Sequence, residues 1–257
     1  MGSKDSLYFE IQADFGITKH LGGLRATREL AELCHLKKGK SVLVVGCGIG
    51  TTSCYLAERY GVKVIGVDIS KGMIARAKER ARRKGLEGKV EFRTADAQKL
   101  PFKDNLFDAV VSESVIAFVN DKVKAVKEYL RVTKPGGFIG LNECLWLKTP
   151  PAELVKYLSR LMGGPEFRNS EDLIKLLKEA GLKNIKEKTY KLTLVGQFAE
   201  EIKTFEFRDF IRAWYRFLIG SLFNPSYRKF TKEALRMPKS VFKFMEYMGY
   251  GLYISRK

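Results

Sequence analysis

Short apolar runs alternate with segments of helical periodicity along most of the chain from residue 24 onwards. The runs predict strands, and they cover 41–45, 62–67, 90–94, 107–112 and 138–143. The periodic segments predict helices over 24–34, 51–60, 70–84 and 121–132, with Ser70 as an N-cap and Gly85 as a stop. Strands and helices that alternate in this way form a parallel sheet covered by helices.

The pattern changes towards the end of the chain. Helices are predicted over 152–162 and 170–180, and strands over 185–194 and in the final segment YGLYISRK. A mostly helical stretch of about fifty residues separates those strands, far longer than an ordinary loop. KPGG (134–137) is predicted to be a turn. We therefore expect, in order, a lid segment at 1–23, an α/β core at 24–197, a helical cap insert at 198–248 and the last strand at 249–257.

The composition fits a globular protein with an unusually positive charge. The 257 residues are 45% hydrophobic and carry a net charge of +18. Residues 1–150 hold 26 Lys/Arg against 17 Asp/Glu, and residues 151–257 hold 21 against 12, so the charge is spread evenly. It suits an anionic partner such as nucleic acid, a phospholipid surface or a phosphorylated metabolite. A thermophile-like composition rich in Lys, Arg and Glu is the alternative explanation.

The cysteines and the first residues bear on metal binding and location. Four cysteines, at 34, 47, 54 and 144, lack the paired spacing of metal ligands, so we expect reduced thiols and no metal. The segment MGSKDSLYFE has no apolar stretch of a secretory signal, and no apolar run is long enough to cross a bilayer. The expected location is cytoplasmic.

The stretch VLVVGCGIGTTSCYLAERYGVKVIGVDIS (42–70) carries the main chemical signal. Three glycines, Gly46, Gly48 and Gly50, join a predicted strand to a helix, and Asp68 closes the next strand. Such a loop brings backbone close to a nucleotide-like ligand, and the acid can bind two ribose hydroxyls. A tight structural turn is the alternative. Thr51 stands where a dinucleotide loop needs its third glycine, which favours a ligand without phosphates.

Five motifs in order extend this signal: VLVVGCGIG, VIGVDIS, TADAQKLPF, FDAVVSES and KPGGFI. Together they resemble the class I S-adenosylmethionine-dependent methyltransferases over about residues 24–145, and in particular the quinone, sterol and cyclopropane-fatty-acid type. The resemblance implies a Rossmann-like α/β fold, with a mostly parallel seven-stranded sheet and helices on both faces. It also implies S-adenosyl-L-methionine as cofactor and S-adenosyl-L-homocysteine as product.

The resemblance implies a set of cofactor-binding residues. The glycines and Cys47 would border the methionine portion, Asp68 would bind the ribose, and Ile69 would pack on the adenine. Asp96, followed by Ala97, would accept a hydrogen bond from the adenine amino group. Three roles stay open for Glu113: it holds the cofactor ammonium, it holds a substrate amine, or it is a solvated acid at a helix start.

Methyl transfer from a sulfonium is an in-line displacement, so the protein mainly positions the nucleophile. A base is needed only where the nucleophile carries a proton. Glu143, at the end of a predicted strand, is our first candidate for contact with substrate, the alternative being a surface acid paired with lysine. His20 and Tyr8, from the lid segment YFEIQADFGITKHLGG, are further catalytic candidates. Phe9 and Phe15 would help to form the lid. The alternative for His20 is a purely structural role.

Half of the 30 aromatic residues lie between Phe198 and Tyr253. An apolar stripe at helical spacing is expected to lie opposite an arginine stripe; the two stripes comprise Phe207, Phe210, Ile211, Trp214, Phe217 and Leu218, and Arg208, Arg212 and Arg216. Three interpretations remain open: a helical subdomain with its own core, a cap over an apolar substrate, or a basic amphipathic helix on an anionic membrane.

These features predict methyl transfer to a small-molecule or lipid-like acceptor. The charge favours an RNA methyltransferase as the first alternative, but there is no basic block, and no Asp/Asn-Pro-Pro-Tyr loop follows the strand at 107–112. A non-catalytic cofactor-binding or membrane-associated protein is the second alternative. Aminopropyl transfer is the third, although only Glu113 and Glu143 offer carboxylates for a polyamine. Peripheral membrane contact is compatible with all of them, and the oligomeric state is left open.

Overall fold

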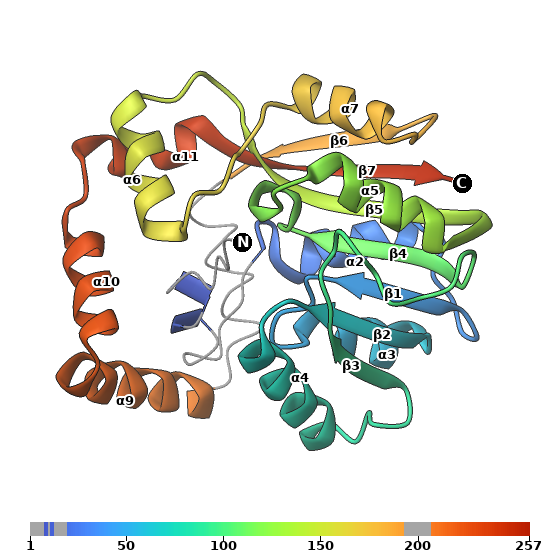
Figure 1. Ribbon diagram of the computed structural model, residues 1–257, viewed down its shortest axis with the longest axis horizontal. Coiled ribbons are helices and arrows are strands. Elements are labelled where there is room, and N and C mark those ends of the chain that lie inside the picture. The colour runs from blue at the N-terminus through green and yellow to red at the C-terminus, as the bar shows by residue number, and fades with distance from the viewer. Residues whose placement is uncertain (1–7, 10, 13–19, 193–206) are drawn as a thin grey trace.

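The computed structural model describes residues 8–9, 11–12, 20–192 and 207–257. Seven strands form one sheet in the order β3-β2-β1-β4-β5-β7-β6 (Figure 1). The strands are β1 (Ser41–Val45), β2 (Lys63–Asp68), β3 (Val90–Thr94), β4 (Phe107–Glu113), β5 (Thr133–Trp146), β6 (Lys186–Lys191) and β7 (Met248–Arg256). The predicted mostly parallel seven-stranded, Rossmann-like sheet is confirmed.

The first five strands run parallel, and helices connect β1 to β2, β2 to β3 and β4 to β5, whereas residues 95–106 connect β3 to β4 without a helix. β1 lies between β2 and β4, with Val44 opposite Gly66 on one side and Val111 on the other. Strands buried on both faces read as continuous apolar runs, as β1 does. β7 runs antiparallel to both β5 and β6, so the last strand enters the sheet between two strands that precede it in the chain.

Helices cover both faces of the sheet, and each face has its own buried cluster. One cluster takes Leu30, Leu56 and Leu154 from α2, α3 and α6, and the other takes Tyr129 and Leu177 from α5 and α7. The helices of the core are α2 (Gly23–Leu33), α3 (Thr51–Tyr60), α4 (Lys71–Arg83), α5 (Lys122–Val132), α6 (Ala152–Met162) and α7 (Ser170–Glu179), with a short 3₁₀ helix η1 (Ile116–Phe118).

Local capping explains where α4 begins and ends. The Ser70 hydroxyl accepts a hydrogen bond from the Met73 amide, as the sequence predicts for an N-cap. After α4, Gly85 has a φ of 64°, the left-handed conformation in which a helix commonly stops.

The prediction of a turn at KPGG is wrong, because those residues lie inside β5. The strand starts at Thr133, which pairs with Phe107 before a register shift. The Gly136 amide donates to the Lys257 carbonyl at 2.8 Å, and the Lys257 amide donates to the Gly137 carbonyl at 2.9 Å. Pairing with residues more than a hundred positions away therefore holds this segment within β5, although Gly136 has a left-handed φ of 76°.

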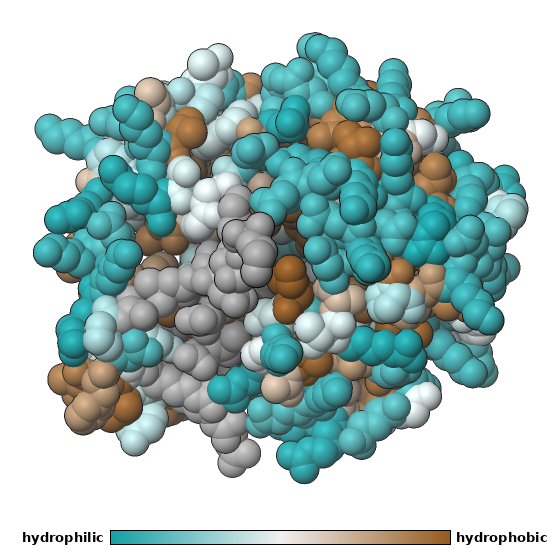
Figure 2. All heavy atoms as spheres, viewed as in Figure 1, coloured by the Kyte–Doolittle hydropathy of each residue, from teal (hydrophilic) through white to brown (hydrophobic). Residues whose placement is uncertain are grey.

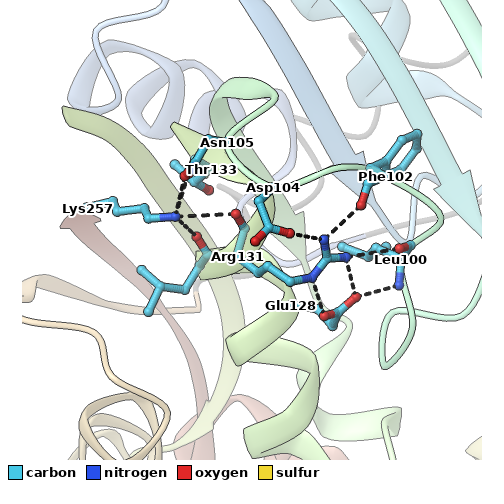
Figure 3. Close-up of polar contacts among 9 residues, drawn as sticks. Leu100, Phe102, Asp104, Asn105, Glu128, Arg131, Thr133 and Lys257 are labelled. Carbon is cyan, nitrogen blue, oxygen red and sulfur yellow. Dashed lines mark hydrogen bonds and ion pairs between the residues drawn. The ribbon is translucent and has the colours of Figure 1, made fainter. Parts of the chain in front are cut away.

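A polar network fixes the C-terminal end of α5 (Figure 3). The Arg131 guanidinium bonds to the carboxylates of Glu128 and Asp104 and to the carbonyls of Leu100 and Phe102. Lys257 Nζ donates to the carbonyls of Leu130, Arg131 and Thr133 and to the Asn105 side chain. Carbonyl oxygens at the end of a helix have no hydrogen-bond partner within the helix. Here Lys257 Nζ donates to three such oxygens.

The predicted helical insert lies between β6 and β7. Its described part contains α9 (Phe207–Phe223), α10 (Pro225–Leu235), η2 (Lys239–Lys243) and α11 (Phe244–Tyr247). Figure 1 shows these elements at one side of the sheet, with α6 beside them. Within the described residues, no helix is both long and apolar enough to cross a membrane. The insert's predicted start at 198 lies outside the described residues, so the domain boundaries remain predictions.

Candidate active site

The three glycines form the turn between β1 and α3, at the carboxyl edge of the sheet. Gly46, Gly48 and Gly50 have φ values of 66°, 51° and 81°, which side-chain-bearing residues rarely adopt. Two of them are also enclosed by the protein itself. A Cβ on Gly46 would overlap the Val115 side chain, and one on Gly50 would lie 2.8 Å from Phe92 Cζ. The sequence alone explains these glycines by the close approach of a ligand. The structure shows that packing inside the protein also requires glycine at two of these positions.

Asp68 ties the glycine turn to the end of β2. Its Oδ2 accepts from the Gly48 amide and its Oδ1 from the Ser70 amide, each at 2.9 Å. Burial raises the pKa of Asp68 above its usual value. The Ile69 amide also favours the ionised form, and an ionised carboxylate has about four acceptor positions, so at least one remains for a hydroxyl group beside this turn.

The predicted adenine residues follow β2 and β3 at the same edge of the sheet. The Ala95 amide donates to the Asp68 carbonyl, which brings the segment after β3 next to Asp68. Asp96 accepts from the amide and the side chain of Gln98, and Ala97 is buried. Ile69 is 64% exposed, an unusual state for an isoleucine beside a well-packed sheet. The structure thus brings Asp68, Ile69 and Asp96 together.

Glu113 is buried at the end of β4, so its interpretation as a solvated acid is wrong. The Thr52 hydroxyl donates to Oε2 at 2.6 Å, and the Thr27 hydroxyl lies 3.0 Å from Oε1. His20 Nε2 lies 3.4 Å from Oε1 and 3.0 Å from the carbonyl oxygen of Gly23. The Thr27 hydroxyl oxygen also lies 2.9 Å from Nε2, so this ring nitrogen contacts three oxygens and its donor or acceptor role depends on the tautomer of His20.

Sequence reasoning missed Thr27 and Thr52 as partners of Glu113. The available signal is their position. Thr27 follows Ala26 on the buried side of α2, and Thr52 lies in the first turn of α3 directly after the glycine turn. A buried threonine on an apolar helix face needs a polar partner, which predicts a carboxylate or carbonyl nearby but does not identify it.

Glu143 is also buried, and the alternative of a surface acid paired with lysine is wrong. Its side chain belongs to β5, and Oε1 accepts from the Val115 and Ile116 amides, each at 3.1 Å. Burial raises the pKa of Glu143 to about 7. The contacts that the structure gives this carboxylate hold the loop after β4, the same loop whose Val115 packs on Gly46.

The described part of the lid segment places Tyr8 and Phe9 against the loop after β4. The Tyr8 ring stacks on Phe118 with centroids 6.5 Å apart, and the Phe9 ring meets Phe118 edge-on at 5.1 Å. Burial raises the pKa of Tyr8 to about 12. Phe15 lies outside the described residues. Cys47 is buried in the glycine turn, and burial raises the pKa of its thiol.

No group of three His, Cys, Asp or Glu side chains among the described residues could hold a metal ion. The elements around the glycine turn therefore bring together carboxylates, a histidine, hydroxyl groups and backbone amides. These groups can bind a polar ligand and accept a proton.

Comparison with known proteins finds a family model described as "Methyltransferase domain", which matches residues 43–141. A similar curated protein is phosphoethanolamine N-methyltransferase 1 of Arabidopsis thaliana, 38% identical over 165 residues. That alignment covers 64% of this chain and 33% of the relative, so the chain spans about a third of the length of the first curated relatives that it matches.

Solved structures with the same fold include proteins of different function. The cyclase SpnF superposes with a TM-score of 0.76 at 22% identity, covering 98% of this chain and 92% of SpnF. Phosphoethanolamine N-methyltransferase 2 of Haemonchus contortus, in complex with phosphomonomethylethanolamine and S-adenosylhomocysteine, gives a TM-score of 0.72 at 22% identity. That match covers 99% of this chain and 59% of the nematode chain. At this identity the structural likeness shows the fold alone.

Proposed function

Because the chain carries a class I S-adenosylmethionine-dependent methyltransferase domain, as its motifs predict, we propose that it transfers a methyl group to a small-molecule or lipid-like acceptor. The observation that carries the proposal is the glycine turn with Asp68 on the neighbouring strand. This turn lies where the strand order reverses between β1 and β4, the place where open α/β sheets bind ligands.

The residues at this edge fit S-adenosylmethionine group by group. Asp68 retains acceptor capacity for the ribose hydroxyls, and the exposed Ile69 offers an apolar face for the adenine. Asp96 would accept from the adenine amino group. Glu113 would hold an ammonium, since no lysine or arginine of the described part of the chain pairs with this buried carboxylate. The bound cofactor supplies an electrophilic methyl group on a sulfonium.

The chain's own residues then have to orient the acceptor and manage its proton. An amine acceptor is protonated at neutral pH and becomes a nucleophile only after it loses that proton. His20 would take it, and the Glu113 carboxylate, whose Oε1 lies 3.4 Å from Nε2, would stabilise the resulting imidazolium. Tyr8 would cover the acceptor from the lid segment. Glu143 would act indirectly, because it holds the loop after β4 through the amides of Val115 and Ile116.

The acceptor that we propose to test first is a small amine that carries a phosphate. The Arabidopsis and Haemonchus relatives are named for phosphoethanolamine, and the net charge of +18 favours anionic molecules. The decisive assay incubates the protein with methyl-labelled S-adenosylmethionine and separate pools of small molecules, lipids and RNA. Label in the small-molecule or lipid pool supports the proposal. Label in RNA alone supports the RNA methyltransferase, and label in no pool supports a non-catalytic protein.

Asp68→Ala is expected to weaken S-adenosylhomocysteine binding about 10- to 100-fold. Hydrogen bonds to a charged acceptor contribute about 1.5–3 kcal/mol, which corresponds to that range of affinity. Isothermal titration calorimetry measures the change. The matched control is Glu91→Ala, which removes an exposed carboxylate from the neighbouring strand β3 and should bind like the wild type. Equal affinities for the Asp68 variant and the wild type would refute the ribose assignment.

A further inference from the structure

We propose that the outer surface of α9, together with the basic side chains of α10, binds the surface of an anionic phospholipid membrane. We call this region the α9 surface. Its apolar part consists of exposed side chains of α9: Ile211, Trp214, Tyr215, Leu218, Ile219, Leu222 and Phe223. The proposal concerns where the protein acts and does not depend on the methyl-transfer reaction.

Exposed apolar side chains are concentrated in this region. Among the described residues, thirteen large hydrophobic side chains are exposed, and seven of them lie on α9. Leu222 and Phe223 are 66% and 78% exposed, and Phe242 is 83% exposed. Scattered exposed hydrophobic residues are normal on soluble proteins, but a contiguous group on one helix marks an interaction site.

The opposite side of α9 is already packed, so the exposed side chains are not an unfinished core. A Cβ on Gly220 would lie 2.7 Å from the Tyr227 ring, which shows how closely α9 and α10 approach. The rings of Phe217 and Tyr227 lie 6.4 Å apart, and Tyr227 is buried. The Tyr157 hydroxyl on α6 donates to the Ala234 carbonyl at 3.1 Å, which ties α10 to the core.

The charge around α9 indicates the kind of partner. Residues 207–235, which span α9 and α10, contain six Lys/Arg and two Asp/Glu. Lys229 and Lys232 of α10 are exposed, and no acidic side chain of the described residues pairs with them. Figure 2 shows apolar atoms gathered at the lower left, where α9 lies in Figure 1, with hydrophilic atoms above them along α10.

An anionic membrane suits this combination better than the other partners do. A second copy of the chain would bring two basic surfaces together, which their charges oppose. RNA would use the lysines but not the aliphatic side chains of Leu218, Ile219 and Leu222. A helix with an apolar face and basic surroundings lies in the plane of the headgroups, with the apolar side chains at the acyl boundary. The 17 residues of α9 give it a length of about 25 Å for such contact.

The protein has two tryptophans, at 146 and 214, so Trp214 becomes a selective reporter once Trp146→Phe is introduced. We expect vesicles of phosphatidylcholine with 30% phosphatidylserine to shift the Trp214 emission to shorter wavelength and to sediment the protein. Vesicles of phosphatidylcholine alone should bind at least tenfold more weakly. Binding to the mixed vesicles should fall when NaCl is raised to 500 mM, because salt screens the attraction between the lysines and the headgroups.

Variants locate the binding surface. Leu218→Glu and the double change Lys229→Glu/Lys232→Glu should each weaken vesicle binding at least tenfold. Leu106→Glu changes an exposed leucine elsewhere on the molecule and should bind like the wild type. All four positions are exposed, so far-ultraviolet circular dichroism and thermal unfolding should match the wild type.

Three results would overturn the proposal. One is the absence of sedimentation with the mixed vesicles, and another is unchanged binding by Leu218→Glu. The third is self-association in sedimentation velocity that Leu218→Glu abolishes without any vesicle binding, which would assign the α9 surface to a second copy of the chain.

Discussion

At Glu143, burial and hydrogen bonding act on the pKa in opposite directions. Burial raises the pKa to about 7, while the amides of Val115 and Ile116 favour the ionised form. Between the pKa of an ordinary glutamate, 4.5, and about 7, the folded protein keeps a proton that the unfolded chain has released. Raising the pH through this window therefore favours unfolding.

Glu143→Gln is expected to remove this pH dependence. From pH 5 to pH 8 the free energy of unfolding of the wild type should fall relative to that of the variant, by on the order of 3 kcal/mol. Glutamine keeps an oxygen that accepts from the two amides, so the loop should stay in place. Urea unfolding at several pH values measures the difference.

Glu153→Gln provides the control, because this glutamate is exposed on α6. It should show the same pH profile as the wild type. Parallel profiles for Glu143→Gln and the wild type would mean that Glu143 has an ordinary pKa in the folded protein.

At the scale of elements, the turn after β1 and the loop after β4 fit against each other. Val115 occupies the space that a side chain on Gly46 would need, and Glu143 of β5 holds the amide of the same Val115. The turn after β1, the loop after β4 and strand β5 are therefore in contact through Val115, and a substitution in one of them is expected to affect the packing of the other two. The predicted cofactor site is built on this contact.

Gly46→Ala is expected to destabilise the protein by about 2–4 kcal/mol. A left-handed φ costs a non-glycine residue about 1–2 kcal/mol, and overpacking adds about 1–3 kcal/mol. Adding Val115→Ala to this variant should remove the destabilisation due to overpacking but not the destabilisation due to the left-handed φ. The double variant should thus be more stable than the sum of the two single changes predicts, as urea unfolding of all four proteins will measure. Strict additivity would show that Val115 does not restrict position 46.

Local signals made most elements predictable. The spans of β1, β3, α3 and α6 follow directly from apolar runs and helical periodicity, and the Ser70 cap follows from its hydroxyl. The extension of β5 through KPGG did not follow, because it depends on pairing with Lys257 at the other end of the chain. Glycines favour a turn locally, but hydrogen bonds to a distant segment can place them in a strand instead.

The site was predictable to a similar extent. Motif order identified Asp68, Asp96, Glu113 and Glu143 as strand-end acids, and all four lie at the carboxyl edge of the sheet. Their partners could not be predicted, because contacts such as Thr52 with Glu113 join positions that are 61 residues apart. Of the predicted apolar stripe on α9, Ile211, Trp214 and Leu218 are exposed, whereas Phe217 lies beside Tyr227. Whether a core or solvent faces such a stripe depends on tertiary packing.

At the scale of the whole molecule, the net charge of +18 makes stability depend on salt. Exposed ion pairs such as Lys84–Glu58 and Arg93–Glu91 contribute little, so they offset only a small part of the mutual repulsion of the excess cations. The screening length falls from about 30 Å at 0.01 M salt to about 8 Å at 0.15 M. Added salt should therefore weaken the repulsion more than it weakens the short-range pairs.

Raising NaCl from 10 mM to 150 mM at pH 7 is expected to raise the unfolding temperature by about 2–5 °C. This corresponds to about 1 kcal/mol in a chain of this size. Differential scanning calorimetry measures the shift, and an uncharged osmolyte at the same osmolality controls for effects other than screening. A constant or falling unfolding temperature would mean that the surface ion pairs outweigh the repulsion. The same repulsion would then be too weak to oppose pairing of two α9 surfaces, so this measurement also tests the charge argument for a membrane partner.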